Sequence, residues 1–347
     1  KLNRRKQQLV RVASETGADV VSVNQVGGYT DILFDGQSMS VTKDGEVRTV
    51  CPAFREGCFS LDQVSLGGSD KSRWETVLTA ISFGLREYIS HTGFKTVVVG
   101  LSGGIDSALV AALAVHALGP DQVTLVTLPT QYNSDETKAD AVSMAERLGA
   151  SLITKPIESY RQLIEGDMPS VLEESGINDI AKQNIQARLR GLILMAISNH
   201  TGALLLTTGN KSELAMGYAT LYGDMCGGFN PIGDLFKTDV VALACYINEQ
   251  FGWIPESIIE RPPSAELAPD QRDEDSLPAY DRLDQILDQR IMKGNSLNKL
   301  IELNDKQDVE LVLKRLKNNE FKRFQSPPIL KLSSKAFGRG WQFPLVR

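Results

Sequence analysis

From residue 74 onward, short apolar runs alternate along the chain with longer stretches in which apolar residues recur every three or four positions. The apolar runs have the length and residue types of buried strands, whereas the stretches between them have helical spacing. The four predicted strands are KTVVVGL (95–101), DQVTLVTLP (121–129), ASLITKPI (150–157) and ALLLTTG (203–209). Apolar strands separated by helices predict a parallel sheet covered on both faces, and hence an α/β fold.

The chain before residue 74 follows a different pattern. A helical stretch at 2–16 leads into a short apolar strand within 18–28, and FDGQSMSVTKDGEVRTV (34–50) alternates around two DG steps, which is typical of β-hairpins. Residues 60–73 are polar and rich in Gly and Ser, as linkers are. Because Lys1 opens inside an amphipathic pattern and is not an initiator Met, we expect a fragment. The predicted segments are part of an α+β domain (1–62), a linker (63–73) and a larger domain (74–347).

Composition narrows the class of protein. The 347 residues carry a net charge of −6 with a pI near 5.3, which argues against a protein that binds a nucleic-acid backbone. The four cysteines lack any CxxC pair or zinc-ligand spacing, and no apolar run reaches the roughly 18–20 residues that cross a bilayer. The opening KLNRRKQQLV also lacks a signal-peptide core. We expect a cytoplasmic protein with neither nucleic-acid nor membrane partners.

SGGIDS (102–107) lies at the turn between the first predicted strand of the sheet and the following helix. Ligands of such sheets bind beyond the carboxyl ends of the strands, where a helix N-terminus offers N–H groups to anions. Gly103 and Gly104 let a bulky anion approach the backbone, and Ser102 and Ser107 can donate hydroxyl groups. The motif matches neither GxxxxGK[ST] nor GxGxxG, so we predict a phosphate cradle of another kind.

Asp106 is the informative residue of this turn. An acid beside a phosphate makes sense mainly when a divalent cation bridges the two. The alternative is an ordinary helix start, with Ser102 or Asp106 as the N-cap and the glycines forming the turn. Capping alone does not require two glycines, two serines and an acid together, so we favour the phosphate site.

Several separated blocks resemble one known family. SGGIDS after an apolar strand resembles the signature of the N-type ATP pyrophosphatases, which adenylate a substrate and release pyrophosphate. Residues 204–240, with KQNIQARLR (182–190) and LSSKAFGRGW (332–341), resemble the synthetase domain of the glutamine-dependent NAD synthetases. Residues 23–47 are similar to the late part of the nitrilase-like glutaminase domain of that family. The resemblance implies an adenine-nucleotide alpha-hydrolase-like domain over 74–345, preceded by a fragment of a nitrilase-like domain.

The resemblance also implies a reaction. ATP with Mg²⁺ would adenylate the carboxylate of deamido-NAD, AMP and pyrophosphate would be released, and ammonia would supply the amide of NAD. In the intact family the ammonia comes from glutamine through a Glu, a Lys and a Cys of the glutaminase domain. We assign none of these here, since neither Cys51 nor Cys58 has the context of that nucleophile, and free ammonia is the expected donor for a truncated chain. A homo-oligomer with paired synthetase domains is implied as well.

Catalytic and ATP-binding residues carry over from the resemblance by position. Asp106 and Glu213 match two acids that hold magnesium, and Lys237 matches a lysine that stabilises the leaving pyrophosphate, so Asp106 and Lys237 are the predicted catalytic residues. Without the family, Glu213 is a solvated acid at a helix start and Thr208 a helix cap. The predicted ATP-binding residues are Leu101, Ser102, Gly103, Gly104, Ile105, Asp106, Ser107, Thr208 and Lys237.

The predicted substrate-binding residues are Asn184, Arg188, Glu213 and Lys335. Asn184 and Arg188 are four positions apart on one predicted helix and therefore share a face. A surface position is the alternative for Asn184 and Lys335, and a solvated helix face for the neighbouring Arg190. Side-chain packing is the alternative to substrate contact for Tyr218, Tyr222 and Asp224.

Two other functions stay open from the sequence. One is an N-type ATP pyrophosphatase that amidates or thiolates another substrate, and the other is a non-catalytic nucleotide-binding subunit. The absence of cysteine pairs argues against thiolation, and the presence of Asp106, Glu213 and Lys237 argues against binding alone.

Overall fold

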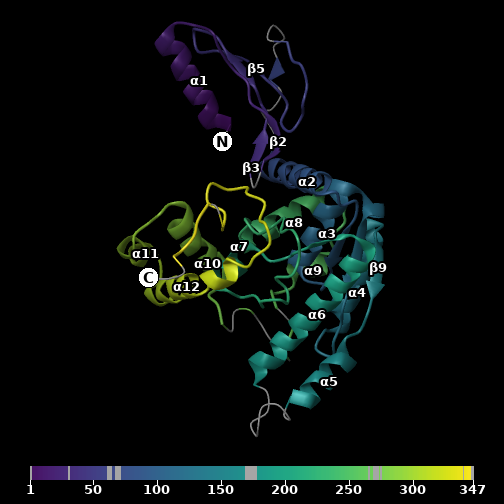
Figure 1. Cartoon of the computed structure of the whole chain (residues 1–347). Helices are drawn as coiled ribbons and strands as arrows, with labels where there is room; N and C mark the ends of the chain where they lie inside the picture. The colour runs from purple at the N-terminus through teal and green to yellow at the C-terminus, as the bar shows by residue number, and fades with distance from the viewer. Residues whose placement is uncertain are drawn as a thin grey trace. The chain divides into compact units, whose positions relative to one another are not determined.

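The computed structural model describes two compact units of the chain (Figure 1). The first ends at Tyr88 and the second begins at Ile89, inside helix α2 (Arg73–Thr92). The predicted linker at 63–73 lies largely outside the described residues, and its boundaries stay a prediction. The described residues are 2–29, 32–60, 65–66, 72–168, 178–264, 266–268, 273, 276–338 and 340–344.

The first unit contains helix α1 (Leu2–Thr16) and two small sheets. Strands β1 (Val20–Ser22), β4 (Met39–Val41), β5 (Val47–Val50) and β6 (Ser65–Leu66) form one sheet in this order, and β2 (Val26–Tyr29) pairs with β3 (Ile32–Asp35). The DG step at 44–45 turns the β4–β5 hairpin, as predicted, with Gly45 at φ 85°. The DG step at 35–36 does not turn a hairpin, because β3 ends at Asp35 and pairs back with β2.

The second unit is built on a four-stranded parallel sheet in the order β10-β7-β8-β9, which confirms the predicted α/β fold. The strands are β7 (Val97–Gly100), β8 (Val123–Thr127), β9 (Ser151–Thr154) and β10 (Leu204–Leu206). The chain runs from β7 outward to β9 and then returns, so that β10 lies on the other side of β7. The crevice at such a reversal is where ligands bind in open α/β sheets.

Helices cover both faces of this sheet. Successive residues of a strand point to opposite faces, so strands that are apolar throughout need cover on both. Helix α6 (Asp179–Thr201) packs on the face that carries Val98 and Leu205, through a cluster that includes Leu189. Helix α3 (Ile105–Leu118) contacts β7 and β8 and is buried along nearly its whole length. Strand β9, at one edge of the sheet, is less buried than predicted, with Ile153 41% exposed, whereas β10 at the other edge is buried.

The remaining helices of the sheet layers connect or flank these strands. They are the short 3₁₀ turn at Pro120–Gln122, α4 (Asp135–Leu148), α5 (Glu158–Asp167), α7 (Lys211–Met216), α8 (Lys237–Phe251) and α9 (Glu256–Glu260). In the described part of the chain, no helix is both long and apolar enough to span a bilayer.

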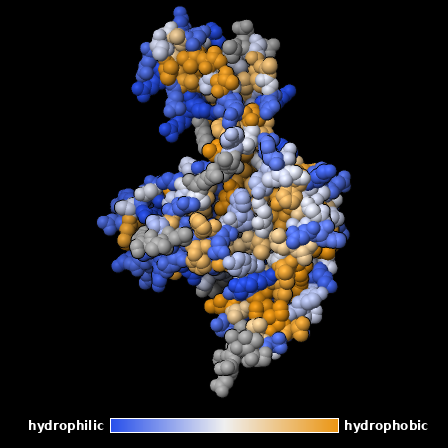
Figure 2. Space-filling view, in the orientation of Figure 1, coloured by the Kyte–Doolittle hydropathy of each residue, from blue (hydrophilic) through white to orange (hydrophobic). Residues whose placement is uncertain are grey.

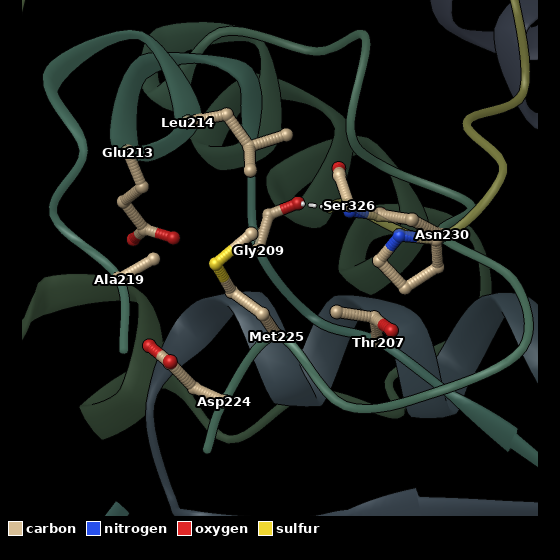
Figure 3. A pocket seen from close by; sticks show the side chains of 10 residues that line it. Thr207, Gly209, Glu213, Leu214, Ala219, Asp224, Met225, Asn230 and Ser326 are labelled. Carbon is tan, nitrogen blue, oxygen red and sulfur yellow. Dashed lines mark hydrogen bonds between the residues drawn. The ribbon is translucent and has the colours of Figure 1, made fainter. Parts of the chain in front are cut away.

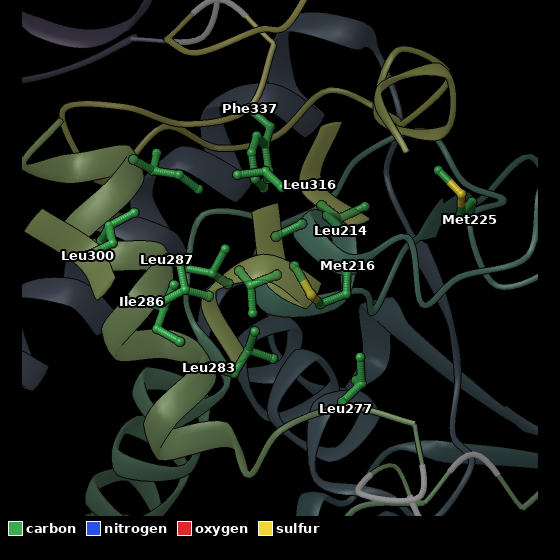
Figure 4. Close-up of a cluster of buried hydrophobic side chains, with 14 residues drawn as sticks. Leu214, Met216, Met225, Leu277, Leu283, Ile286, Leu287, Leu300, Leu316 and Phe337 are labelled. Atoms are coloured by element: carbon green, nitrogen blue, oxygen red, sulfur yellow. The ribbon is translucent and has the colours of Figure 1, made fainter. Parts of the chain in front are cut away.

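A second hydrophobic cluster joins α7 to the helices that follow (Figure 4). Leu214 and Met216 of α7 belong to one buried cluster with Leu283, Leu316 and other apolar side chains, and Phe337 comes to it from the C-terminal segment. The contributing helices are α10 (Tyr280–Leu287), a π-helical turn at Asp288–Met292, α11 (Leu297–Leu303), α12 (Lys306–Asn318) and the short α13 (Glu320–Arg323). This cluster fixes α7 next to the sheet's carboxyl edge.

Candidate active site

The turn between β7 and α3 has a shape that only glycine permits at one position. Leu101 extends the strand pairing, with its N–H donating to the Val126 carbonyl at 2.8 Å. Gly103 has φ 86°, and a Cβ there would lie 2.4 Å from Cγ2 of Thr137. A side chain at this position would collide with α4 and strain the backbone.

The two serines of SGGIDS brace the turn. Their Oγ atoms lie 3.0 Å apart, the Ser107 hydroxyl donates to the Gly104 carbonyl at 3.0 Å, and the Gly104 N–H donates to Ser102 Oγ at 3.2 Å. The N-cap of α3 is Gly104, which supplies no side chain, so neither Ser102 nor Asp106 caps the helix. The first turn of α3, including the buried Ile105, is therefore left without a side-chain cap, as an anion site requires.

Asp106, Glu213 and Lys237 converge although they lie on three helices. Lys237 forms an ion pair with Asp106 Oδ2, and its Nζ lies 3.8 Å from Glu213 Oε1. The Asn210 amide donates to Asp106 Oδ1 at 2.8 Å, and the Asn210 N–H donates to Glu213 Oε2 at 3.2 Å. Asn210 thus links the two acids, as the N-cap of α7 and as a partner of Asp106.

Three acidic side chains, Asp106, Glu213 and Asp273, surround the ammonium of Lys237. Burial disfavours the Lys237 ammonium, but the charges of Asp106 and Glu213 outweigh that effect and raise the pKa of Lys237. Burial and the charge of Asp106 raise the pKa of Glu213 well above its ordinary value, although Lys237 opposes this. Asp273, which is 4% exposed, adds a third acid, and burial raises its pKa. A divalent cation bound here would favour the charged forms of these acids, which burial disfavours.

Tyr280 closes the cluster on the side of α10. The Lys237 Nζ lies 5.5 Å from the centre of the Tyr280 ring, and the Tyr280 hydroxyl donates to Asp273 Oδ2 at 2.8 Å. A lysine over an aromatic face gains a cation–π attraction when water is excluded. No group of three or more His, Cys, Asp and Glu side chains forms a metal-ligand cluster among the described residues.

A small cavity of about 10 Å³ lies beside the cluster (Figure 3). This is roughly the room of one water molecule. Glu213, Asp224 and Met225 are among its lining residues, and Asn230 on another side donates its amide to the Gly209 carbonyl at 2.9 Å. Thr208 follows β10 at the same edge of the sheet and is half-buried. It does not cap α7, whose N-cap is Asn210.

Helix α6 directs two predicted residues to one loop. Asn184 Oδ1 accepts a hydrogen bond from the Thr220 hydroxyl at 2.8 Å, and Arg188 Nε donates to the Leu221 carbonyl at 3.2 Å, which confirms that they share a face. Arg190 turns elsewhere and donates to the Leu128 carbonyl at 3.2 Å. Arg190 is half-buried and its guanidinium nitrogen Nη2 lies 3.4 Å from Asn133 Oδ1, so this side chain is tied to the loop after β8.

Lys335 reaches the site through its backbone. Its carbonyl accepts a hydrogen bond from Lys211 Nζ at 2.9 Å. Its own ammonium lies beside Gly294, 4.0 Å from where a Cβ on that glycine would stand. The structure therefore joins the C-terminal segment to the start of α7, while the lysine side chain points to the end of the π-helical turn.

Arg261 and Glu266, from the acidic, Pro-rich stretch at 260–278 in which no site residue was predicted, lie against the SGGIDS turn and the start of α4. Arg261 donates to the Gly103 carbonyl at 3.1 Å and pairs with Asp140 of α4. Glu266 accepts hydrogen bonds from Thr137 at 2.7 Å and from the Asn133 side chain at 2.8 Å. The sequence gives no periodic signal for these contacts, because the stretch is irregular.

Sequence reasoning also missed Asn210, Lys211 and Asp234. The asparagine was recoverable, since an N-cap residue followed three positions later by Glu is the pattern of a capping box. Lys211 and Asp234 were not, because a buried lysine or aspartate looks like a surface residue in the sequence until its partner is known.

Comparisons with known proteins agree on one family. The family model described as NAD synthase matches residues 77–326. The chain is 42% identical over 370 residues to a glutamine-dependent NAD(+) synthetase of Rhodobacter capsulatus. That alignment covers 100% of this chain but 66% of the relative, and other relatives are covered to a similar extent. The chain therefore spans slightly less than two thirds of the relatives' length.

Solved structures show the same relationship. A glutamine-dependent NAD+ synthetase from Acinetobacter baumannii in complex with adenosine diphosphate is 36% identical with a TM-score of 0.72, over 99% of this chain and 64% of that one. An NH3-dependent NAD synthetase from Campylobacter jejuni is 28% identical with a TM-score of 0.59, over 73% of this chain and 96% of that one. The second comparison spans nearly the whole of a shorter relative.

Proposed function

This chain belongs to the NAD synthase family, and we propose that it is a carbon–nitrogen ligase that converts deamido-NAD to NAD. ATP activates the substrate carboxylate, and ammonia then replaces AMP. The observation that carries the proposal is the convergence of Asp106, Glu213 and Lys237 beside the uncapped start of α3. Similarity to synthetases over the whole chain supports it.

The first step needs an activated carboxylate, because a free carboxylate is a poor electrophile. The carboxylate oxygen attacks the α-phosphorus of ATP, the bond to the β-phosphate oxygen breaks, and pyrophosphate leaves. The N–H groups of the first turn of α3, with Gly103 and Gly104, bind the departing phosphates. Lys237 stabilises their negative charge, and the rigid turn supplies orientation.

Asp106 and Glu213 would hold a magnesium ion, which neutralises phosphate charge when bound. The residues fit this ion, since two carboxylates are what magnesium usually takes from a protein in a phosphate site. The three acids around Lys237 support the same assignment.

The second step forms the amide. Ammonia attacks the acyl carbon, AMP leaves with the former carboxylate oxygen, and the nitrogen loses a proton. The cavity beside Glu213 has room for a molecule the size of water, and ammonia is of that size. We place the dinucleotide against α6 and the C-terminal segment, with Asn184, Arg188 and Lys335 as its contacts.

The nitrogen donor is proposed from two relatives that differ in the donor they use. The chain resembles both a glutamine-dependent and an NH3-dependent synthetase. Cys51 is buried and Cys58 exposed, and neither stands in the context expected of the glutaminase nucleophile. We therefore propose that these residues use free ammonia, and that glutamine serves only with a glutaminase. ATP consumption and the free cysteines favour the cytoplasm as the place of reaction.

We also propose a homo-oligomer that pairs second units. Helices α5 and α6 expose Leu163 (72%), Ile180 (70%) and Leu192 (66%), and Figure 2 shows an apolar surface over these helices. Contiguous exposed apolar surface marks interaction sites in soluble proteins. Arg188 lies on the same helix, so pairing there would bring the partner near the dinucleotide contacts.

The test is NAD formation with release of AMP and pyrophosphate, measured with ATP and Mg²⁺ and with either ammonium or glutamine. Deamido-NAD and nicotinate mononucleotide are compared as substrates. We expect NAD from deamido-NAD with ammonium and none with glutamine. Amidation of the mononucleotide in preference would correct the substrate, and ATP binding without pyrophosphate release would contradict the enzyme.

A further inference from the structure

Lys211 and Asp234 form an ion pair that the proposed mechanism does not use. Both side chains are 0% exposed, and Lys211 Nζ lies 2.7 Å from Asp234 Oδ1. Removing two charges from water is costly, and their mutual attraction offsets this cost only where further hydrogen bonds satisfy both groups. The partners of this ion pair therefore indicate its role.

The further hydrogen bonds come from residues 332–337, which we call the C-terminal strap. Asp234 Oδ2 accepts from the N–H groups of Leu332 at 2.9 Å and Ser333 at 2.6 Å, and Oδ1 accepts from the Ser333 hydroxyl at 2.8 Å. Lys211 donates to the Lys335 carbonyl at 2.9 Å and to Ser333 Oγ at 3.3 Å. Outside the strap, the described hydrogen-bond partners of the ammonium are Asp234 and, at 3.7 Å, the weak acceptor Sδ of Met292. The lysine's three donors are thus matched only with the strap in place.

The same pair is attached to the catalytic cluster through the backbone. Lys211 is the first residue of α7, between the cap Asn210 and Glu213, and its N–H donates to the Leu235 carbonyl at 2.8 Å. Asp234 precedes Lys237 by three residues, at the entry to α8. The pair therefore fixes the start of α7, which carries Glu213, against the start of α8, which carries Lys237.

We propose that Lys211 and Asp234 are positioning residues that couple docking of the C-terminal strap to the geometry of Glu213 and Lys237. This inference rests on the proposed function, which gives Glu213 and Lys237 their roles. Undocking the strap removes three hydrogen bonds from Asp234 and two from Lys211 in a buried place. The unsatisfied pair then rearranges and moves the helix starts, so the docked strap and the competent site stabilise each other.

The experiment compares the full chain with Lys211→Met and with the double variant Lys211→Met/Asp234→Asn, which leaves no buried charge. Lys317→Met, at an exposed lysine on α12, is the matched control. One readout is tryptic cleavage after Lys335, followed by mass spectrometry. That cleavage requires the carbonyl that Lys211 binds. The other readout is kcat and KM for NAD formation per folded molecule, with the folded fraction taken from circular dichroism.

We expect both folded variants to be cut after Lys335 at least about 10-fold faster than wild type, and kcat to fall about 10- to 100-fold through misplaced groups. The control should match wild type. Faster cleavage with unchanged kcat and KM would mean that the pair holds the strap without affecting the site. Unchanged cleavage would mean that the pair does not hold the strap. Either result overturns the proposal. If the single variant does not fold, the double variant carries the test.

A failure of the proposed function can be told apart from a failure of the proposed coupling. If the wild type makes no NAD, the dissociation constant for ATP with Mg²⁺ replaces turnover, because the proposed site places Lys237 and Glu213 against that ligand whichever carboxylate the chain adenylates. A weakening of about 10-fold in the variants, with faster cleavage, supports the coupling. An unchanged constant overturns it.

Discussion

Asp106 holds two partners with its two carboxylate oxygens. Oδ2 pairs with Lys237, and Oδ1 accepts from the Asn210 amide at 2.8 Å. At the scale of single residues this side chain is the centre of the site, because its two partners, Lys237 and Asn210, are also the residues that lie beside Glu213. A neutral side chain at this position would leave Lys237 with less negative charge around it.

Replacement of Asp106 by Asn tests this role. We expect kcat/KM for ATP in NAD formation to fall at least about 100-fold, because a preorganised charge is lost where phosphate charge develops. Steady-state kinetics at fixed Mg²⁺ measure the effect. Asp121→Asn, at an exposed acid of the 3₁₀ turn, is the matched control and should leave the kinetics unchanged. Undiminished synthesis by the Asp106 variant would remove the residue from the mechanism.

Residues in a compact motif were predictable, and residues that depend on a distant partner were not. SGGIDS indicated the phosphate turn because glycine, serine and aspartate have distinct local reasons to occur there. Glu213 and Lys237 came from the family resemblance, and the structure brings both to Asp106. The role of Ser107 in bracing the turn could not be foreseen, since a hydroxyl can face a ligand or its own backbone.

At the scale of elements, α7 is a short helix whose first turn is hydrogen-bonded both within itself and to α3. Its capping box joins Asn210 to Glu213, and the Asn210 side chain also donates to Asp106. The helix therefore positions Glu213, a proposed magnesium ligand, by the interaction that also stabilises its first turn. Helices and strands of the sheet layers followed from apolar periodicity, whereas this capping arrangement depends on a contact across 104 residues.

Asn210→Ala should lose both stability and activity. We expect the free energy of unfolding to fall by about 1–2 kcal/mol, as for other lost caps, and kcat to fall about 10-fold or more because Glu213 and Asp106 lose their link. Urea denaturation and NAD formation measure the two effects. Asn178→Ala removes the cap of α6, where Asn178 accepts from the Ala181 N–H at 2.8 Å, and should affect stability alone. Equal kinetic effects in both variants would contradict the prediction.

Asp284 of α10 is hydrogen-bonded to α7 and α8, and its burial leads us to expect that the stability of the protein depends on pH. It accepts hydrogen bonds from Ser212 of α7 and, at 2.9 Å, from the Thr238 N–H of α8. Burial raises the pKa of Asp284 from 3.8 to about 6. Because the folded pKa lies above the unfolded one, the stability from the bound proton is complete below pH 3.8 and is lost as the pH rises through about 6.

The wild type should therefore lose about 1.4 kcal/mol of unfolding free energy, relative to Asp284→Asn, between about pH 5 and about pH 7.5. Asparagine stays neutral and can still accept from Thr238, so the variant lacks this titration. Urea denaturation of both proteins at the two pH values gives the difference. A pH-independent difference would show that Asp284 does not hold its proton in the folded state.

At the scale of the whole molecule, the parallel sheet explains why the fold was predictable while the site was only partly so. Runs such as KTVVVGL contain enough local information to predict a buried strand. Strand order does not follow from such runs, and it is the place of β10 beside β7 that brings α3 and α7 together. The first unit shows the same limit of prediction. The alternation of polar and apolar residues at 34–50 predicted strands there, but it did not predict which strands pair.

The proposed homo-oligomer gives a prediction at this scale. Leu192→Glu places a charge on the exposed apolar face of α6, and we expect it to shift the mass in solution from dimer to monomer. Light scattering coupled to size exclusion measures the mass. Leu297→Glu, at a 48% exposed leucine of α11, is the control and should stay dimeric. A monomeric wild type, or a dimeric Leu192 variant, would rule out this face.

The return of the chain from β9 to β10 also sets an order of events in folding. Asp106 and Lys237 are 131 residues apart, and contacts over such separations form slowly because a long loop must close first. A chain that grows from its N-terminus can align β7, β8 and β9 before β10 has been made. The proposed nucleotide site is therefore the last part of the sheet to be built, and on this proposal an incompletely synthesised chain cannot hydrolyse ATP.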